Sequence, residues 1–146
     1  MRVEVQIDPG CEETRVVIVA GRMTEEVAAL AQRLTQSGPR VLAGFDGERV
    51  AVLAEGDIAR VYTEGGRVLA EARGRVYRLR MRLYEAESWL DPGRFVRISK
   101  AEIINLRQVT GFDLSPSGVI CVKLEGGTVT YVSRRYVAKI KQVLGL

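Results

Sequence analysis

The chain has 146 residues, of which 47% are hydrophobic and 27% charged, proportions typical of a folded globular protein and not of a disordered or fibrous one. It contains no histidine, which excludes the Ser-His-Asp and Cys-His forms of nucleophilic catalysis, histidine-containing zinc sites and a histidine proton shuttle. The net charge is +4, and its positive excess lies in residues 41–146, with 17 basic and 12 acidic side chains against 5 and 6 in residues 1–40. Any surface for a polyanion is therefore expected in residues 41–146.

The first forty residues predict two strands and a helix. Residues 2–7 alternate apolar and polar side chains, the pattern of a half-buried strand, until Asp8-Pro9-Gly10 ends it. The run RVVIVA at residues 15–20 predicts a second strand, buried on both faces. Thr24 can cap a helix whose apolar spacing continues until Gly38-Pro39. This β-β-α segment is too short to bury its own core, so it either packs on residues 41–146 or forms a dimer contact.

From residue 41 onward the pattern changes to short strands separated by tight turns. The pairs Asp46-Gly47, Gly65-Gly66 and Gly126-Gly127 each predict a hairpin. A short helix is predicted over residues 84–90, closed by Asp91-Pro92-Gly93, and Ser133 is a suitable N-cap for a final helix. The predicted fold class is α+β, mostly antiparallel β with short helices, in two parts: an appendage of residues 1–40 and a main domain of residues 41–146.

Two basic features stand out in the main domain. Residues 75–83 (RVYRLRMRL) predict one strand, whose polar face carries Arg78, Arg80 and Arg82 at intervals of roughly 7 Å. Such a row could follow a phosphate backbone, although spacing alone favours a solvated face that protects an edge strand. The second feature is Arg134-Arg135 at the start of the final helix, a pair that suits either a phosphate contact or a solvent-exposed basic face of that helix.

Nothing in the sequence indicates catalysis, a cofactor or export. Carboxylates are scattered, no phosphate-binding loop is present, and Cys11 and Cys121 lie 110 positions apart without a C-x-x-C pair. We expect no enzyme activity, no metal, no cofactor, no small-molecule substrate, and reduced structural thiols. No signal peptide is predicted, nor any stretch near the roughly 18 apolar residues of a membrane span, so a cytoplasmic protein is expected.

The order of motifs between residues 50 and 144 resembles the LytTR family of bacterial DNA-binding domains. The resemblance is carried by DIARVYTEGGRVLAEARGRVYRLRMRLYEAESWL (57–90), FVRISKAEIINLRQV (95–109) and LEGGTVTYVSRRYVAKIKQVL (124–144). The family pattern has an aromatic-x-Arg-Ile-His-Arg-Ser-Tyr-x-Val-Asn block, a strand, an Asn/Asp-Gly turn and a Ser-Arg-Arg/Lys-Tyr helix start. The short opening segment is similar to that of LytTR regulators that lack a phosphorylatable receiver domain.

The chain departs from this pattern in the central block. Where the family has His-Arg-Ser-Tyr, this sequence has Ser99, Lys100, Ala101 and Glu102. Lys100 keeps a cation but lacks the bidentate fork of an arginine. Glu102 is expected to put an anion near the DNA-facing surface.

The resemblance implies a β domain that presents loops, and not a recognition helix, to DNA. It predicts that Lys100 and Arg135 contact base edges or adjacent phosphates, and that three further arginines anchor the phosphate backbone, namely Arg67, Arg97 and Arg134. Asn105 is left out, because an Asn at the end of an apolar strand usually bonds to neighbouring backbone.

Two functions follow from these residues. The first is a sequence-specific, double-stranded DNA-binding transcriptional regulator that acts on promoter direct repeats, with a homodimer as its expected form. The alternative is a protein-interaction module whose basic loops bind an acidic partner, such as an inhibitory membrane protein, without specific DNA binding.

Overall fold

The contacts within the chain form two units, Met1–Gly38 and Pro39–Leu146, each of which is treated by itself. They are seen in a computed structural model that describes residues 1–35 and 41–146. None of the helices in these described residues is long and apolar enough to cross a membrane.

The described residues of the first unit contain one regular element, helix α1 (Glu25–Thr35). Its predicted cap is confirmed, because the backbone N–H of Val27 donates to Thr24 Oγ1 at 3.2 Å and satisfies one of the free donors of the first turn. Asp8-Pro9-Gly10 forms a turn, in which the Gly10 N–H donates to Asp8 Oδ1 at 2.9 Å. The predicted helix stop at Gly38-Pro39 lies outside the described residues.

The two strands predicted before this helix are wrong. Residues 2–7 and 15–20 have no regular secondary structure, and all their apolar side chains except the half-buried Ile18 are exposed, with Val5 at 82% and Val19 at 91%. A strand needs a hydrogen-bonded neighbour and a cover for its apolar face. Within the described part of this unit neither segment has such a neighbour, so local β-propensity alone does not form the strand.

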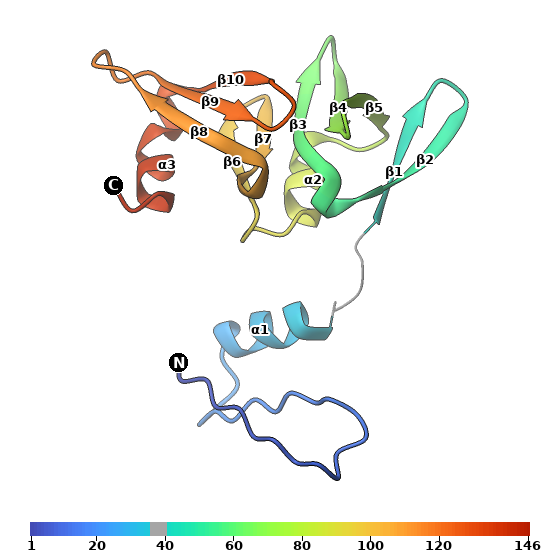
Figure 1. Cartoon of the computed structure of the whole chain (residues 1–146), viewed down its shortest axis with the longest axis vertical. Coiled ribbons are helices and arrows are strands. Elements are labelled where there is room, and N and C mark those ends of the chain that lie inside the picture. The colour runs from blue at the N-terminus through green and yellow to red at the C-terminus, as the bar shows by residue number, and fades with distance from the viewer. Residues whose placement is uncertain (36–40) are drawn as a thin grey trace. The chain divides into compact units, whose positions relative to one another are not determined.

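The second unit consists of two antiparallel sheets and short helices (Figure 1). The larger sheet has the order β2-β1-β5-β4-β3-β7-β6 and the smaller one the order β10-β9-β8. The strands are β1 (Val41–Asp46), β2 (Arg49–Ala54), β3 (Ile58–Glu64), β4 (Arg67–Ala72), β5 (Arg75–Leu79), β6 (Phe95–Ser99), β7 (Glu102–Asn105), β8 (Val109–Leu114), β9 (Ile120–Leu124) and β10 (Val129–Val132). The helical elements are η1 (Glu55–Asp57), α2 (Leu83–Trp89), η2 (Leu106–Gln108), η3 (Arg134–Tyr136) and α3 (Val137–Val143).

Tight turns with positive φ set this strand order. The three hairpins predicted at Asp46-Gly47, Gly65-Gly66 and Gly126-Gly127 are confirmed, and at the second of them Gly65 and Gly66 have φ of 58° and 76°. A fourth hairpin, between β4 and β5, was not predicted. Its turn is Arg73-Gly74, with φ of 51° and 75°, and it was missed because arginine is not among the residues favoured at the first position of such a turn.

The strand predicted over residues 75–83 is shorter than expected, because β5 ends at Leu79 and helix α2 begins at Leu83. Leu83 is buried in the core between the larger sheet and α2. The chain must therefore leave the sheet after Leu79 so that α2 can cover one face of it. Arg80 stacks over the ring of Phe45 at 4.0 Å from its centroid. The predicted row of three arginines on one strand is therefore wrong.

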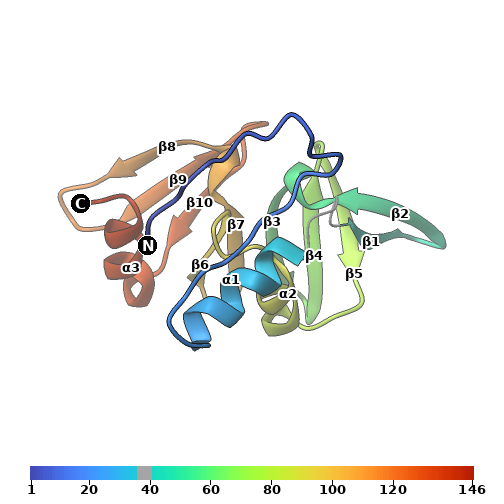
Figure 2. The ribbon, with the colours of Figure 1, turned by 90° about the horizontal axis from the view of Figure 1, so that it is seen from below.

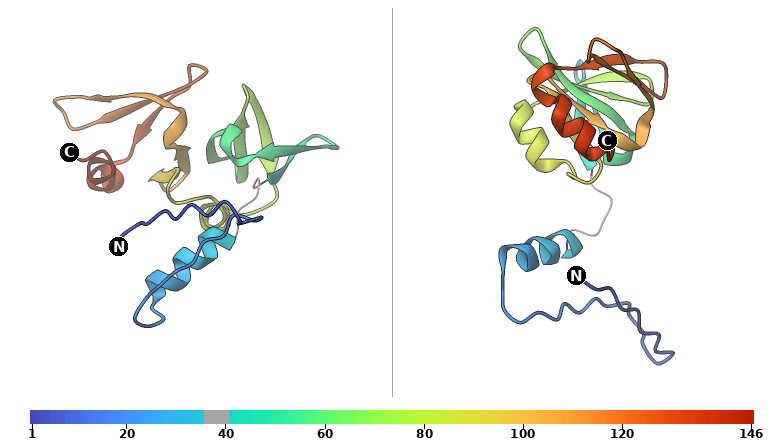
Figure 3. Two further views of the ribbon diagram at one scale, coloured as in Figure 1. Left: turned by 60° about the horizontal axis from the view of Figure 1, so that its bottom comes forward. Right: turned by 90° about the vertical axis from the view of Figure 1, so that its left-hand side faces the viewer.

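The core has two parts that meet at the hairpin of β6 and β7. One lies between the larger sheet and α2, and includes Ile103. The other lies between this hairpin, the smaller sheet and α3, and includes Ile98 and Ile104. Figures 2 and 3 show α3 beside the smaller sheet. Neighbouring residues of β7 thus enter different cores, as the alternation of side chains along a strand requires. Of the three apolar residues whose spacing predicts the inward face of the last helix, Ile140 is buried and Val137 is half-buried, whereas Leu144 lies just beyond α3 and is 37% exposed.

Gly44 of β1 offers a test of this packing. A Cβ at this position would lie 2.7 Å from Leu53 Cδ1 and 2.9 Å from Tyr77 Cβ, whereas a Cβ on Gly111 of β8 would meet nothing within 4 Å. We expect Gly44→Ala to lower the free energy of unfolding by about 1–3 kcal/mol through overpacking. We expect Gly111→Ala to leave it unchanged or raise it by up to about 1 kcal/mol. Urea unfolding measures both, and equal effects of the two substitutions would contradict the packing around β1.

Candidate nucleic-acid interface

Strand pairing brings two of the predicted basic loops to the same end of the larger sheet. Strands β3 and β7 are neighbours, with Tyr62 opposite Glu102. Just beyond this pair, the Thr63 N–H donates to the carbonyl of Ala101 at 2.8 Å. The turn between β3 and β4, which leads into Arg67, and the loop between β6 and β7, which carries Lys100, therefore lie side by side.

A second backbone hydrogen bond brings the start of the final helical segment to this end. The Ser133 N–H donates to the carbonyl of Ile98 at 2.9 Å, so that the end of β10 meets the end of β6. Arg134 and Arg135 follow at once in η3. The Ser133 side chain makes no capping hydrogen bond, and the turn is closed by its carbonyl, which accepts from the Tyr136 N–H at 2.9 Å.

We call the four exposed cations at this end the basic edge: Arg67, Lys100, Arg134 and Arg135. They come from three segments that are far apart in the sequence. None of the four forms an ion pair with a carboxylate among the described residues. Their charge is thus available to an anionic ligand, and three separate loops can follow a polyanion better than one compact site could.

Arg97 lies at the same end but is engaged within the protein. Its Nε donates to the carbonyl of Ser99 at 2.8 Å and its Nη2 to the carbonyl of Lys100 at 2.5 Å. Its Nη1 pairs with the Glu87 carboxylate of α2 at 2.5 Å, and only 17% of the Arg97 side chain is exposed. Arg97 is therefore bound to the Lys100 loop and, unlike the four cations of the basic edge, is largely buried and paired with a carboxylate.

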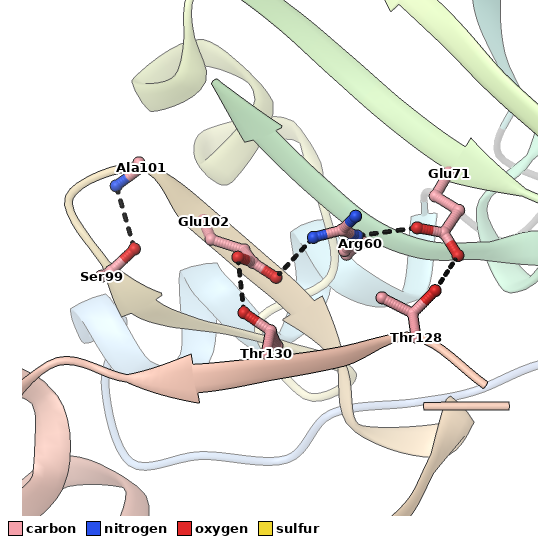
Figure 4. A network of polar contacts seen from close by, with 7 residues as sticks. All are labelled: Arg60, Glu71, Ser99, Ala101, Glu102, Thr128 and Thr130. Carbon is pink, nitrogen blue, oxygen red and sulfur yellow. Dashed lines mark hydrogen bonds and ion pairs between the residues drawn. The ribbon is translucent and has the colours of Figure 1, made fainter. Parts of the chain in front are cut away.

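Glu102 does not extend toward the basic edge, contrary to the expectation from sequence. Its side chain is 12% exposed, and its carboxylate pairs with Arg60 at 3.4 Å and accepts from Thr130 Oγ1 at 2.8 Å (Figure 4). Glu102, which stands where the family pattern has a tyrosine, is thus neutralised by Arg60 of β3. It adds little negative charge to the surface next to Lys100.

The Glu102 contacts belong to a polar network that joins the two sheets. Arg60 of β3 also pairs with Glu71 of β4 at 2.7 Å, and Glu71 accepts from Thr128 Oγ1 at 2.5 Å, next to β10 (Figure 4). Sequence inspection missed this network, because its members only meet once the strands are in register. An arginine alternating with apolar residues in IARVY was the one local signal.

The charges in this network reinforce one another. Burial lowers the pKa of Arg60, but the hydrogen bond to Glu71 and the negative charges of Glu102 and Glu71 outweigh it and raise the pKa above the ordinary value. The guanidinium also lies over the ring of Tyr62, 4.0 Å from its centroid. Burial raises the pKa of the Tyr62 hydroxyl, and the positive charge of Arg60 offsets only part of that rise. Arg60 is therefore a permanent cation at the junction of the sheets.

Asn105 has the structural role that its position predicts. It is 1% exposed, its side-chain amide donates to the carbonyl of Ile58 at 2.8 Å, and its Oδ1 accepts from the Arg107 N–H at 3.0 Å. Both polar groups of its side chain are therefore engaged within the protein.

A second group of arginines lies at the other end of β4, around the Arg73-Gly74 turn. A hollow of about 490 Å³ opens there, and three guanidinium-bearing side chains and one carboxylate contribute to its wall, namely Arg49, Arg73, Arg75 and Asp46. Strand β2, the edge strand of the larger sheet, supplies the exposed Val50 and Val52. This hollow is separate from the basic edge because β4 runs from Arg67 at one end to the Arg73-Gly74 turn at the other.

No metal site is visible in the described residues, where no group of three His, Cys, Asp or Glu side chains could hold an ion. Cys11 and Cys121 are free thiols.

Comparisons with known proteins give a family, a group of relatives and a similar fold. The model of the LytTr DNA-binding domain matches residues 48–145. Uncharacterized HTH-type transcriptional regulators of Staphylococcus aureus strains COL and NCTC 8325 are each 29% identical over 147 aligned residues, which cover 100% of this chain and 99% of theirs. The solved LytTr DNA-binding domain of a methyl-accepting/DNA response regulator from Bacillus cereus superposes with a TM-score of 0.71 at 16% identity. That match covers 75% of this chain and 100% of the solved one.

Removal of Arg60 should weaken the junction of the sheets. We expect Arg60→Met to lower the free energy of unfolding by roughly 3 kcal/mol, because two largely buried carboxylates lose their common counterion. Arg78→Met, at an exposed arginine of β5, should change it by no more than about 0.5 kcal/mol. Denaturant unfolding of both variants checks this, and a small effect at Arg60 would show that the network does not hold the two sheets together.

Proposed function

Because the chain belongs to the LytTR family of DNA-binding domains, we propose that it is a transcriptional regulator that binds specific sequences in double-stranded DNA through the basic edge. The observation that carries this proposal is the convergence of Arg67, Lys100, Arg134 and Arg135 from three loops, each exposed and free of ion pairs with the described residues. The proposed activity is binding without a catalytic step. It takes place in the bacterial cytoplasm, where chromosomal DNA lies.

The mode of binding that we propose uses loops and not a helix–turn–helix. Among the described residues of the second unit, α2 and α3 are separated by strands β6 to β10, so they do not form such a pair. The β6–β7 loop and the η3 turn are narrow enough to approach base edges in a groove, whereas the sheets are too wide to enter one. A cation at each loop tip serves both phosphate attraction and base contact.

We assign different roles to the four cations. Lys100 and Arg135 contact base edges, because they follow the two segments that the Ser133–Ile98 hydrogen bond holds together. Arg67 and Arg134 contact phosphates on either side of them. Arginine can donate two parallel hydrogen bonds to guanine, whereas lysine acts as a single cation, so Arg135 is expected to contribute more to base discrimination than Lys100.

A dimer fits the proposed recognition of promoter direct repeats, and the first unit is its proposed contact. Val3, Val5, Val16 and Val19 are all exposed in that unit. The S. aureus relatives align with the whole chain, so they have a counterpart of this segment. A second copy would supply the hydrogen-bonded neighbour and the apolar cover that these β-prone residues need.

A second candidate function rests on the hollow at the Arg73-Gly74 turn. Its three arginines suit carboxylates, and the free edge of β2 with exposed Val50 and Val52 suits an extended apolar segment. An acidic protein segment, for example from an inhibitory membrane protein, would match both features. This partner could act alongside DNA binding or in its place.

The DNA-binding proposal predicts a specific pattern of mutational effects. Binding to its own promoter DNA should weaken with salt, with a slope of log K against log salt of roughly −0.9 per neutralised phosphate. Lys100→Ala and Arg135→Ala should each cost about 1–3 kcal/mol of binding and change base preference, whereas Arg67→Ala and Arg134→Ala should weaken binding to all sequences and lower the slope by about 1. Fluorescence anisotropy with promoter and scrambled duplexes measures these effects.

Arg75→Ala is the matched control, since it removes the same charge at the other end of β4 and should leave promoter binding nearly unchanged. Normal specific binding by the Lys100→Ala, Arg135→Ala double variant would contradict the assigned contacts. If the folded wild-type chain does not bind DNA at low salt, the acidic-partner function becomes the better explanation.

The dimer proposal is tested by sedimentation. The full chain should sediment as a dimer at concentrations at which a truncated chain beginning at Pro39 sediments as a monomer. Val5→Asp in the full chain should shift it toward monomer without unfolding the second unit. Monomer masses for both the full and the truncated chain would rule out the first unit as the dimer contact.

A further inference from the structure

We propose that Arg97 is a positioning residue that holds the Lys100 loop in the shape required for DNA recognition, and that Glu87 of α2 holds Arg97 in turn. Sequence resemblance predicts a different role, in which Arg97 anchors a phosphate of the DNA backbone. The proposal rests on the proposed DNA-binding function and names the residues that prepare its central loop.

The contacts of Arg97 support a role within the protein. Its guanidinium donates to the carbonyls of Ser99 and Lys100 at 2.8 Å and 2.5 Å, and to the Glu87 carboxylate at 2.5 Å. With 17% of its side chain exposed, it has little free surface for a ligand. Glu87 also cancels its charge, so Arg97 contributes far less to phosphate attraction than an exposed, unpaired cation such as Lys100.

The loop needs such a brace because strand pairing alone does not hold it. The register between β6 and β7 shifts between Arg97 and Ser99, which leaves an irregular ladder at the loop. A carbonyl without a ladder partner must find another donor or remain solvated. Arg97 supplies two donors at this irregularity, to two consecutive carbonyls, as the forked guanidinium permits and an ammonium group does not.

Both backbone polar groups of Ala101 are also held by hydrogen bonds that do not belong to the β6–β7 ladder. The Ala101 carbonyl accepts from the Thr63 N–H at 2.8 Å, and the Ala101 N–H donates to Ser99 Oγ at 3.1 Å. Three consecutive carbonyls, from Ser99 to Ala101, therefore have protein donors. The backbone that carries Lys100 is ordered before DNA binds, which lowers the entropy cost of recognition.

The pairing with Glu87 gives this proposal a distinctive test. Removing a negative charge near a DNA-binding edge should strengthen DNA binding if only charge matters. If Glu87 holds Arg97 in place, Glu87→Gln should instead weaken specific binding by about tenfold, as expected when a charge-assisted hydrogen bond is lost. Glu64→Gln is the matched control, because Glu64 is exposed at the end of β3 and makes the same change in charge next to the Gly65-Gly66 turn.

The Arg97→Lys variant distinguishes a phosphate contact by Arg97 from a positioning role within the loop. Lysine keeps the charge, so a phosphate anchor would retain most of its affinity. If Arg97 positions the loop instead, the Arg97→Lys variant should bind specific DNA about tenfold more weakly with an unchanged salt slope, because one ammonium group does not span three acceptors. The Glu87→Gln, Arg97→Lys double variant should lose no more than Arg97→Lys alone, since both changes break the same interaction.

Amide hydrogen exchange without DNA gives a readout that does not depend on the proposed function. The Thr63 and Ala101 amides should exchange several times faster in Glu87→Gln than in the wild-type chain, and should be unchanged in Glu64→Gln. Glu87 is 47% exposed, so its substitution by Gln is compatible with folding.

The proposal is supported if Glu87→Gln and Arg97→Lys weaken promoter binding, leave binding to scrambled DNA unchanged and raise the exchange rates of the Thr63 and Ala101 amides. It is overturned if Glu87→Gln behaves like Glu64→Gln in both binding and exchange. If the wild-type chain shows no specific DNA binding, the proposed function fails, while the exchange measurement still decides whether Glu87 and Arg97 order the loop.

Discussion

Burial of the β6–β7 hairpin on both faces is the constraint on which the second unit depends. Ile103 packs beneath the larger sheet with α2, and the adjacent Ile104 packs with the smaller sheet and α3. A hairpin shared by two cores cannot shift its register by one residue without turning both apolar sets to the wrong side. The two strands that lead into and out of its loop are therefore fixed in position, and Arg97 holds the loop itself, which carries Lys100.

The polar network around Arg60 complements this apolar constraint. It links β3, β4 and β7 to the hairpin of β10 through two carboxylates and two threonine hydroxyls. Charged groups with so little exposure are tolerated only when they are paired and hydrogen-bonded, and directional bonds of this kind select one arrangement of the sheets. Because Ser133 follows β10 directly, the same arrangement determines where Arg134 and Arg135 lie relative to Lys100.

Local patterns in the sequence predicted much of the fold and failed where a segment depends on distant partners. The glycine turns and the Thr24 cap were correct, because each is set by residues within a few positions of one another. The strands predicted in the first unit were wrong. Alternating apolar and polar residues favour a strand, but the strand forms only when a neighbouring strand pairs with it. The strand predicted to continue to residue 83 stopped at Leu79, because the core beneath the larger sheet requires Leu83 on a helix.

For the candidate interface, the sequence by itself determined which loops carry cations and which chemistry is available, a set of arginines and a lysine with no histidine. Only the tertiary structure decided which charges remain free. Arg97 and Lys100 are equally basic in the sequence, yet one is paired with Glu87, ten positions away, and the other is exposed. Glu102 likewise pairs with Thr130 across 28 positions and leaves the surface. The physical reason is that pairing depends on strand register and on a bulge, which bring together side chains that no local spacing relates.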